Sequence, residues 1–156
     1  MALDVDFVTA LRRVTQKWRT RWDAELRDSG QTLGRSRALL LLHQGGGDVM
    51  QRDLAEQLSV EHPTLVRLLD GLERQGLIRR EPVPGNARAN RIVLTEQAAP
   101  VVAEVDAVSA KLRERVLRSI PREDIATALR VLESISARLE ELDSIPAEPD
   151  METAGR

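Results

Sequence analysis

The sequence predicts a mainly α-helical protein with one small β-hairpin, and two patterns lead to this fold class. Apolar residues recur at steps of three and four over long stretches near both ends of the chain, which is the spacing of one helix face. Between these stretches lie two short β-prone runs on either side of a turn-rich segment. We therefore expect helices, then a hairpin, then helices again.

The composition is typical of a globular protein that works in water. Of the 156 residues, 42% are hydrophobic and 31% are charged. The longest apolar run, residues 38–42, is far too short to span a bilayer. Acidic residues stand near the N-terminus, where a signal peptide carries basic ones, so we expect a cytoplasmic protein. The chain has no cysteine, which excludes disulfides, thiolate metal sites and cysteine catalysis, and we expect neither a metal nor a cofactor.

Two helices are predicted before a run of glycines. The first covers residues 4–27 and ends at Ser29-Gly30, while the second contains residues 38–43 and ends at the glycines 45–47. The apolar face of the first helix consists of Phe7, Leu11, Val14, Trp18, Trp22 and Leu26.

The next two helices are short and closely spaced, which is typical of a helix-turn-helix. Asp48 is expected to cap the first of them, with Gln51 completing a capping-box-like pair. Pro63 suits the first turn of the second, because a helix leaves that N–H unpaired in any case, and Gly76 is expected to end it. The core face of this second helix consists of Leu65, Leu68, Leu69 and Leu72.

A β-hairpin is predicted directly after this pair of helices, in the position of a wing. Residues 77–83 and 91–95 are β-prone, and residues 84–90 form a turn-rich tip. Residues 74–91 have a net charge of +4, although the whole chain has −2. A phosphate backbone responds to the charge of the surface beside it rather than to the net charge of the whole chain, so this stretch is a candidate nucleic-acid contact. The alternative is a solvated charged surface.

Two long helices are predicted after residue 96, the second beginning near Pro121. The second has a heptad-like apolar seam made of Ile125, Ala128, Leu132, Ile135, Leu139 and Leu142. Together with the first helix of the chain, these helices carry more apolar surface than one small winged domain can cover. We expect them to pair with a second copy; the alternative is that they cover each other within one chain. Residues 144–156 are predicted to be a disordered tail.

Residues 50–97 resemble the MarR family of bacterial regulators, and most closely its SlyA-like branch. The matching segments are LAEQL at 54–58, PTLVRLLDGLE at 63–73, Gly76-Leu77-Ile78, Arg80, and Arg88-Ala89 leading to Arg91-Ile92 and Leu94-Thr95. The resemblance extends over residues 5–142. It implies an intertwined dimerisation region, residues 1–30 and 97–143, around a winged helix-turn-helix DNA-binding lobe, residues 31–96.

The resemblance implies a sequence-specific, double-stranded DNA-binding transcriptional regulator rather than an enzyme. It would be a homodimer on a pseudo-palindromic operator, acting as a repressor or anti-repressor that a small aromatic or anionic ligand relieves. The alternative is a winged-helix module that binds another protein and has lost DNA binding. The family's wing usually carries Asp-x-Arg, and here Asn86-Ala87-Arg88 supplies only a neutral acceptor.

The resemblance and the chemistry of the side chains suggest five DNA contacts: His62, Thr64, Arg67, Arg88 and Arg91. Arg67 is the candidate for base reading, because a guanidinium can bond guanine through two atoms; its alternative is a surface pair with Asp70. Arg88 is expected in the minor groove, and Arg91 on phosphate.

Two further groups of residues have predicted roles. Arg80 is expected to brace Asn86 in the wing. Trp18 and Trp22, one helical turn apart, either line a pocket for an aromatic anion, which His43 would join, or continue the packing of the first helix. No ligand-binding residue is assigned.

Overall fold

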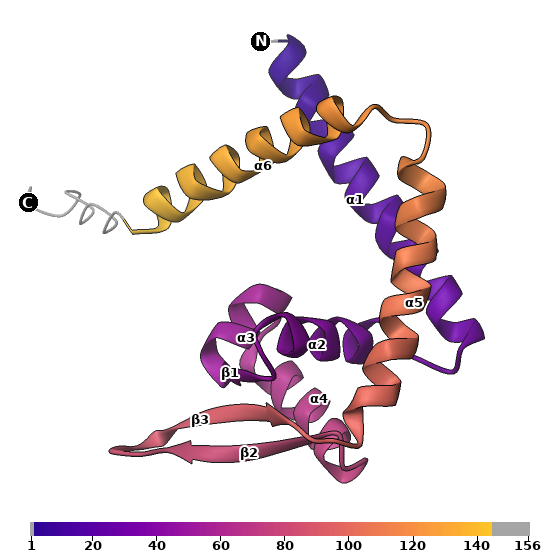
Figure 1. The fold of residues 1–156 in the computed structure, drawn as a ribbon. Helices are drawn as coiled ribbons and strands as arrows, with labels where there is room; N and C mark the ends of the chain where they lie inside the picture. The colour runs from indigo at the N-terminus through magenta and orange to yellow at the C-terminus, as the bar shows by residue number, and fades with distance from the viewer. Residues whose placement is uncertain (1, 145–156) are drawn as a thin grey trace, which may run out of the picture. The chain divides into compact units, whose positions relative to one another are not determined.

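The computed structural model describes residues 2–144 and has the predicted architecture (Figure 1). The elements in chain order are α1 (Ala2–Asp28), α2 (Leu33–Gln44), β1 (Asp48–Met50), α3 (Gln51–Leu58), α4 (His62–Arg74), β2 (Ile78–Val83), β3 (Asn86–Leu94), α5 (Ala98–Leu117) and α6 (Arg122–Asp143). The mainly helical fold with a small β wing is therefore confirmed. From residue 145 on, the predicted disordered tail lies outside the described residues. The described residues form two compact units that divide after Glu114, and both cavities described below lie in the first unit.

The wing belongs to a larger sheet than the predicted hairpin, because a third strand joins it. β1 and β2 both pair antiparallel with β3, which gives the strand order β1-β3-β2. The expected turn-rich tip over residues 84–90 is wrong: the turn takes only residues 84 and 85, and β3 begins at Asn86. The strands of the wing consequently extend further toward its tip than the sequence indicated (Figure 1).

Asp48 does not cap α3 as expected. It lies in β1, and the residue before the helix is Met50, which makes no side-chain capping bond. β1 runs directly into α3, so the pairing of β1 with β3 fixes where the helix begins. The carboxylate of Asp48 binds the guanidinium of Arg91 on β3 instead, with an Nε–Oδ1 distance of 2.9 Å and a second contact from Nη2 to Oδ2.

α4 begins and ends as the sequence predicts. Pro63 lies in its first turn. Gly76, just beyond the last turn, has a φ of 71°, a left-handed conformation that favours glycine. The N–H of Leu77 then donates to the carbonyl of Leu72 at 3.0 Å, which satisfies one of the free carbonyls at the helix end. These two ends fix the length and entry angle of α4.

The core of the winged lobe is one cluster of aliphatic side chains from α2, α3, α4, the sheet and the start of α5. Leu65, Leu69 and Leu72 of α4 are fully buried in it, as predicted, and Leu68 is partly buried. The remaining buried members are Ala38, Leu39, Leu42, Leu54, Leu58, Leu77, Ile78, Ile92, Ala98 and Val102. This packing determines which faces of α3 and α4 remain outside.

α1 and α6 each leave apolar side chains in water. Phe7 and Val14 of α1 are 41% and 58% exposed, and Leu26 is the one buried residue of that helix in the described range. α6 has no buried residue among those described, and its Leu139 and Leu142 are 56% and 63% exposed. Burial of an aliphatic side chain contributes roughly 1.5–3 kcal/mol to stability. Covering these faces with another apolar surface would therefore stabilise the protein further.

Candidate nucleic-acid interface

α4 has three faces with different roles. Its core face is aliphatic, as described above. A second face, which carries Val66, Asp70 and Glu73 at helical spacing, lies toward the base of the wing. The third face carries Thr64 and Arg67, which are exposed and have no hydrogen-bond or ion-pair partner within residues 2–144. This third face is therefore available to a ligand as large as duplex DNA.

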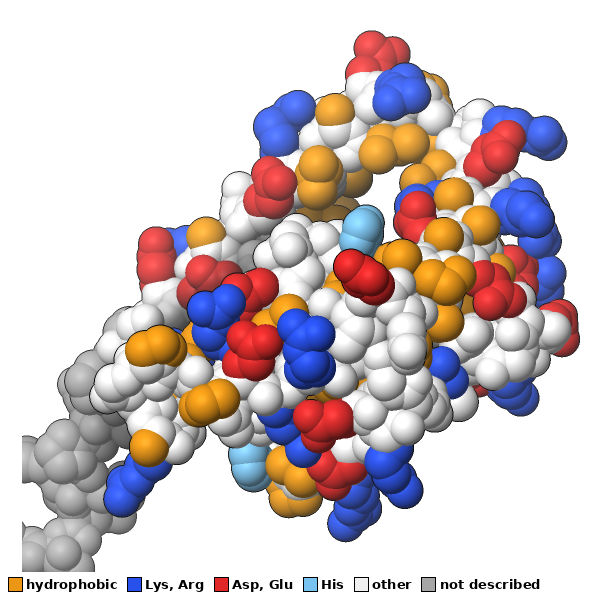
Figure 2. Space-filling model, turned by 60° about the horizontal axis from the view of Figure 1, so that its bottom comes forward, with side chains coloured by type: hydrophobic (Ala, Val, Ile, Leu, Met, Phe, Trp, Pro, Cys, Tyr) orange, Lys and Arg blue, Asp and Glu red, His pale blue; other side chains and the backbone are white. Residues whose placement is uncertain are grey.

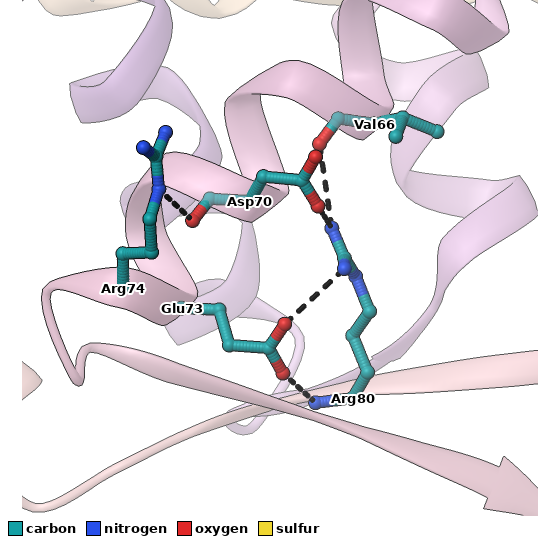
Figure 3. Close-up of polar contacts among 5 residues, drawn as sticks. All are labelled: Val66, Asp70, Glu73, Arg74 and Arg80. Atoms are coloured by element: carbon teal, nitrogen blue, oxygen red, sulfur yellow. Dashed lines mark hydrogen bonds and ion pairs between the residues drawn. The ribbon is translucent and has the colours of Figure 1, made fainter.

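Arg80 joins the base of the wing to α4 (Figure 3). Its Nη2 lies 2.6 Å from Oδ1 of Asp70 and 3.3 Å from the carbonyl oxygen of Val66, and its Nη1 lies 3.2 Å from Oε2 of Glu73. The other oxygen of Glu73 accepts the backbone N–H of Arg80 at 3.2 Å. The Arg80 side chain is only 25% exposed. This cluster sets the angle between β2 and α4.

These contacts correct two predictions. The expected bond between Arg80 and Asn86 is wrong, because in the described part of the chain the guanidinium of Arg80 binds only residues of α4. The alternative surface pair between Arg67 and Asp70 is also not formed, since Asp70 is engaged by Arg80. Arg67 is thereby left free on the open face.

The wing presents Arg88 through a local turn. Oδ1 of Asn86 accepts the backbone N–H of Arg88 at 3.2 Å, and the Arg88 side chain is exposed. The pairing of β2 with β3 jumps from Pro82–Asn90 to Val83–Asn86, so residues 87–89 have no partner on β2. Such a bulge redirects the side chains it carries. Asn86 thus supports the wing, but from within it rather than through Arg80.

A hollow of about 770 Å³ lies between α3, α4 and the wing and collects most of the predicted residues. His62, Arg80, Asn86 and Arg88 all line it. Seen from the wing side, basic side chains stand at several points of the surface with acidic ones between them (Figure 2). Thr64 and Arg67 do not line this hollow and lie on the open face of α4 beside it.

Two residues change the predicted picture of this interface. Arg52 of α3 lines the hollow and is 80% exposed, with one long contact of 3.5 Å to Asp53. Sequence reasoning missed it because it lies outside the charged stretch 74–91. Arg91, in contrast, is held by Asp48. Its expected contact with phosphate stays a prediction, and that contact competes with this ion pair.

A second cavity, of about 280 Å³, lies between α1, α2, α3 and α5. Trp18 and Trp22 both line it, and Trp22 also packs against the buried cluster of Leu26, Leu40 and Val105, so Trp22 fits both the pocket and the packing interpretation. His43 does not join them, because it lines a separate hollow beside α5. The indole N–H of Trp22 is buried and has no hydrogen-bond partner in the described structure. An unpaired buried donor is costly unless a ligand or water supplies an acceptor.

Arg37 of α2 gives this cavity a positive charge. Burial lowers the pKa of its guanidinium, and the nearby charge of Arg19 lowers it further. Arg37 makes no ion pair within residues 2–144. A guanidinium stays protonated at neutral pH, so the cavity contains an uncompensated cation beside two indoles.

Comparison with known proteins identifies the class to which this interface belongs. A model of the MarR family matches residues 29–89. The crystal structure of transcriptional regulator PA3341 is 41% identical, covers 86% of this chain and 98% of that one, and has a TM-score of 0.79. A winged helix-turn-helix with an arginine-lined hollow beside its second helix defines a DNA-binding transcriptional regulator. The chain belongs to the MarR family, whose members are in general transcription factors rather than enzymes.

Two more distant structures have the same fold. A mutant MarR from E. coli complexed with operator DNA is 21% identical, covers 84% of this chain and 94% of that one, and has a TM-score of 0.71. NadR in complex with 4-hydroxyphenylacetate is 21% identical, covers 81% of this chain and 89% of that one, and has a TM-score of 0.73. No helix in the described part of this chain is long and apolar enough to cross a membrane.

Proposed function

We propose that this protein is a homodimeric repressor or anti-repressor that binds a pseudo-palindromic, double-stranded operator in the cytoplasm. The observation that carries the proposal is the hollow between α3, α4 and the wing, which gathers Arg52, His62 and Arg88 beside the open face of α4. Within the family we assign the chain to the SlyA-like branch, on the strength of residues 63–73 and the wing. The operator-bound MarR from E. coli gives a relative with the same fold on DNA.

Arg67 and Arg88 have different roles in this proposal. Arg67, on the open face of α4, reads base edges in the major groove, where two hydrogen bonds to guanine discriminate by about 1–3 kcal/mol. Arg88, on the bulge of the wing, enters the adjacent minor groove, whose negative potential favours arginine. Thr64 and His62, near the start of α4, contact phosphate.

Dimerisation is assigned to residues 1–30 and 97–143. The first range contains the exposed apolar side chains of α1, including Phe7 and Val14, and the second contains those of α6, including Leu139 and Leu142. Pairing with a second copy would remove these side chains from water and hold two winged lobes, residues 31–96, at a fixed separation. Such a dimer matches an operator with two half-sites about one helical turn apart.

The cavity between α1, α2, α3 and α5 is the proposed effector site. Its two indoles offer flat apolar contact, its Arg37 offers a cation, and the buried N–H of Trp22 offers a free donor. These groups together suit a small aromatic anion. NadR, which has the same fold, binds a compound of this kind, 4-hydroxyphenylacetate.

A titration of duplex DNA at several salt concentrations tests the proposal. With six or more phosphates neutralised per dimer, affinity should fall by roughly a thousandfold between 50 and 200 mM salt. The Arg88→Ala variant should have a shallower slope, because it brings one cation fewer to the DNA and so releases fewer counterions. Absence of duplex binding at low salt would contradict the proposal and favour a module that binds another protein.

A further inference from the structure

Most carboxylates of the winged lobe are neutralised by an arginine, but one that is not lies at the start of α4. Ion pairs with arginines hold Asp48, Asp53, Asp70, Glu73 and Glu81. Between residues 48 and 94, Glu56 and Glu61 are the acidic residues without an ion pair in the described structure. Glu56 lies on α3 and lines neither cavity, whereas Glu61 directly precedes α4. A free carboxylate at that place repels the phosphates that its neighbours would contact.

The helix holds the backbone of Glu61 but makes no use of its side chain. The carbonyl oxygen of Glu61 accepts the N–H of Leu65 at 3.0 Å, within the first turn of α4. Glu61 has the extended backbone of a residue that caps a helix, with a φ of −68° and a ψ of 153°, yet its side chain makes no capping bond. The side chains that cap helices well are the shorter Ser, Thr, Asp and Asn. Glu61 therefore combines a fixed backbone with an exposed carboxylate that can meet a ligand.

Glu61 extends the open face of α4 toward the N-terminal end of the helix. Residues three apart lie on the same side of a helix, so Glu61, Thr64 and Arg67 form one row. All three side chains are exposed and have no hydrogen-bond or ion-pair partner within residues 2–144. In a helix-turn-helix, the N-terminal residues of the second helix contact base edges in the major groove. The row spans about 9 Å along the helix axis, so Glu61 and Arg67 meet different base pairs.

The chemistry of a carboxylate limits what Glu61 can bind in that groove. A carboxylate only accepts hydrogen bonds, and the donors on the major-groove edges are the N4 amino group of cytosine and the N6 amino group of adenine. The adenine amino group lies beside N7, an acceptor that repels a carboxylate, and cytosine itself has no such acceptor on this edge. Guanine and thymine present acceptors there. Cytosine is therefore the base that suits Glu61.

We propose that Glu61 is a specificity-determining residue whose carboxylate accepts a hydrogen bond from the N4 amino group of one cytosine in each half-site of the operator. The proposal rests on the function proposed above and adds to it a base that the protein recognises. On duplexes without this cytosine, the carboxylate faces acceptors and phosphates and gains no donor, so those duplexes bind more weakly. Glu61 thus contributes selectivity mainly through a penalty on other sequences.

The Glu61→Gln variant tests this role, because it keeps the size of the side chain and removes its charge. Glu56→Gln is the matched control, since it removes the same charge from an exposed glutamate of the same lobe that also has no ion pair in the described structure. The unaltered protein and both variants are first used in a selection from random duplexes. Anisotropy then measures their affinity for a selected duplex and for the same duplex with the cytosine changed to thymine, which presents the O4 acceptor instead of an amino group.

The unaltered protein and Glu56→Gln should select cytosine at one position of each half-site, and the change to thymine should weaken their binding by about fivefold or more. The same change should alter the binding of Glu61→Gln by less than about twofold, because an amide can donate to O4. An unchanged cytosine preference in Glu61→Gln, or an equal shift in Glu56→Gln, would overturn the proposal while DNA binding stands. So would a uniform loss of affinity for all duplexes in Glu61→Gln, which would indicate a role in starting α4. If the unaltered protein selects no duplex at all, the proposed function fails and this inference with it.

Discussion

Removal of the Arg80 side chain tests whether the angle between the wing and α4 depends on one guanidinium. In Arg80→Ala, the carboxylates of Asp70 and Glu73 and the carbonyl of Val66 lose their shared donor. The two carboxylates, which Arg80 holds on one face of α4, then repel each other. The backbone N–H of Arg80 keeps its bond to Glu73, and the pairing of β2 with β3 does not involve the Arg80 side chain.

The expected loss of stability is about 2–3 kcal/mol. Asp70 and Glu73 are 47% and 41% exposed, so solvent screens each ion pair and limits it to about 0.5–1 kcal/mol. The hydrogen bond to the Val66 carbonyl adds about 1 kcal/mol, because the Arg80 side chain is three-quarters buried. Operator affinity should also fall, by roughly tenfold or 1.4 kcal/mol, since the wing no longer has a fixed angle to α4.

Urea denaturation at constant protein concentration, followed by circular dichroism, measures the first effect, and fluorescence anisotropy with labelled duplex measures the second. Arg79→Ala is the matched control. The Arg79 side chain is 61% exposed and has only a 3.4 Å contact to Glu81, so its removal should change the free energy of unfolding by less than about 0.5 kcal/mol. If Arg80→Ala and Arg79→Ala behave alike in both assays, Arg80 does not set the angle and the reasoning is refuted.

Three further predictions concern the remaining arginines. Arg88→Ala should weaken binding to many duplex sequences about equally, whereas Arg67→Ala should reduce the preference for particular base pairs by about 1–3 kcal/mol. A selection from random duplexes compares the two variants. Identical sequence profiles would contradict the different roles of Arg67 and Arg88. Arg91→Ala should reduce duplex affinity less than Arg88→Ala, because Asp48 already neutralises Arg91, and an equal or larger loss in anisotropy titrations would show that phosphate displaces Asp48. Arg37→Met should raise the free energy of unfolding of the ligand-free protein by a few tenths to about 1 kcal/mol, because it removes a half-buried cation that has no ion-pair partner within residues 2–144. The same variant should abolish the quenching of Trp18 and Trp22 fluorescence by 4-hydroxyphenylacetate. Unchanged quenching would exclude Arg37 as the anion-binding group, and lower stability would contradict the premise that Arg37 has no partner in the ligand-free protein.

Periodicity and helix-end signals predicted the helices well, because both are local. Pro63 and Gly76 determine the ends of α4 through backbone chemistry that neighbouring residues cannot override. The three buried leucines of α4 likewise follow from helical spacing. From these features, the open face with Thr64 and Arg67 could be derived without coordinates.

Contacts between residues far apart in the chain could not be predicted from the sequence. Asp48 is a good capping residue by position, yet it lies 43 residues from Arg91 and binds it across a strand pairing that no local pattern indicates. Arg80 was assigned to the wrong partner for the same reason, since either carboxylates on α4 or an amide in the wing could satisfy it. Arg52 joined the interface only when the fold brought α3 beside the wing.

The central claim is that two copies of the chain present α4 and the wing to successive grooves of one duplex. Hydroxyl-radical footprinting of an operator obtained by selection, combined with the mass of the complex in solution, tests this directly. The account predicts two chains per duplex and two protected half-sites about 10 base pairs apart, with Arg88→Ala losing protection at the outer minor grooves. One chain per duplex, or a single protected half-site, would contradict it.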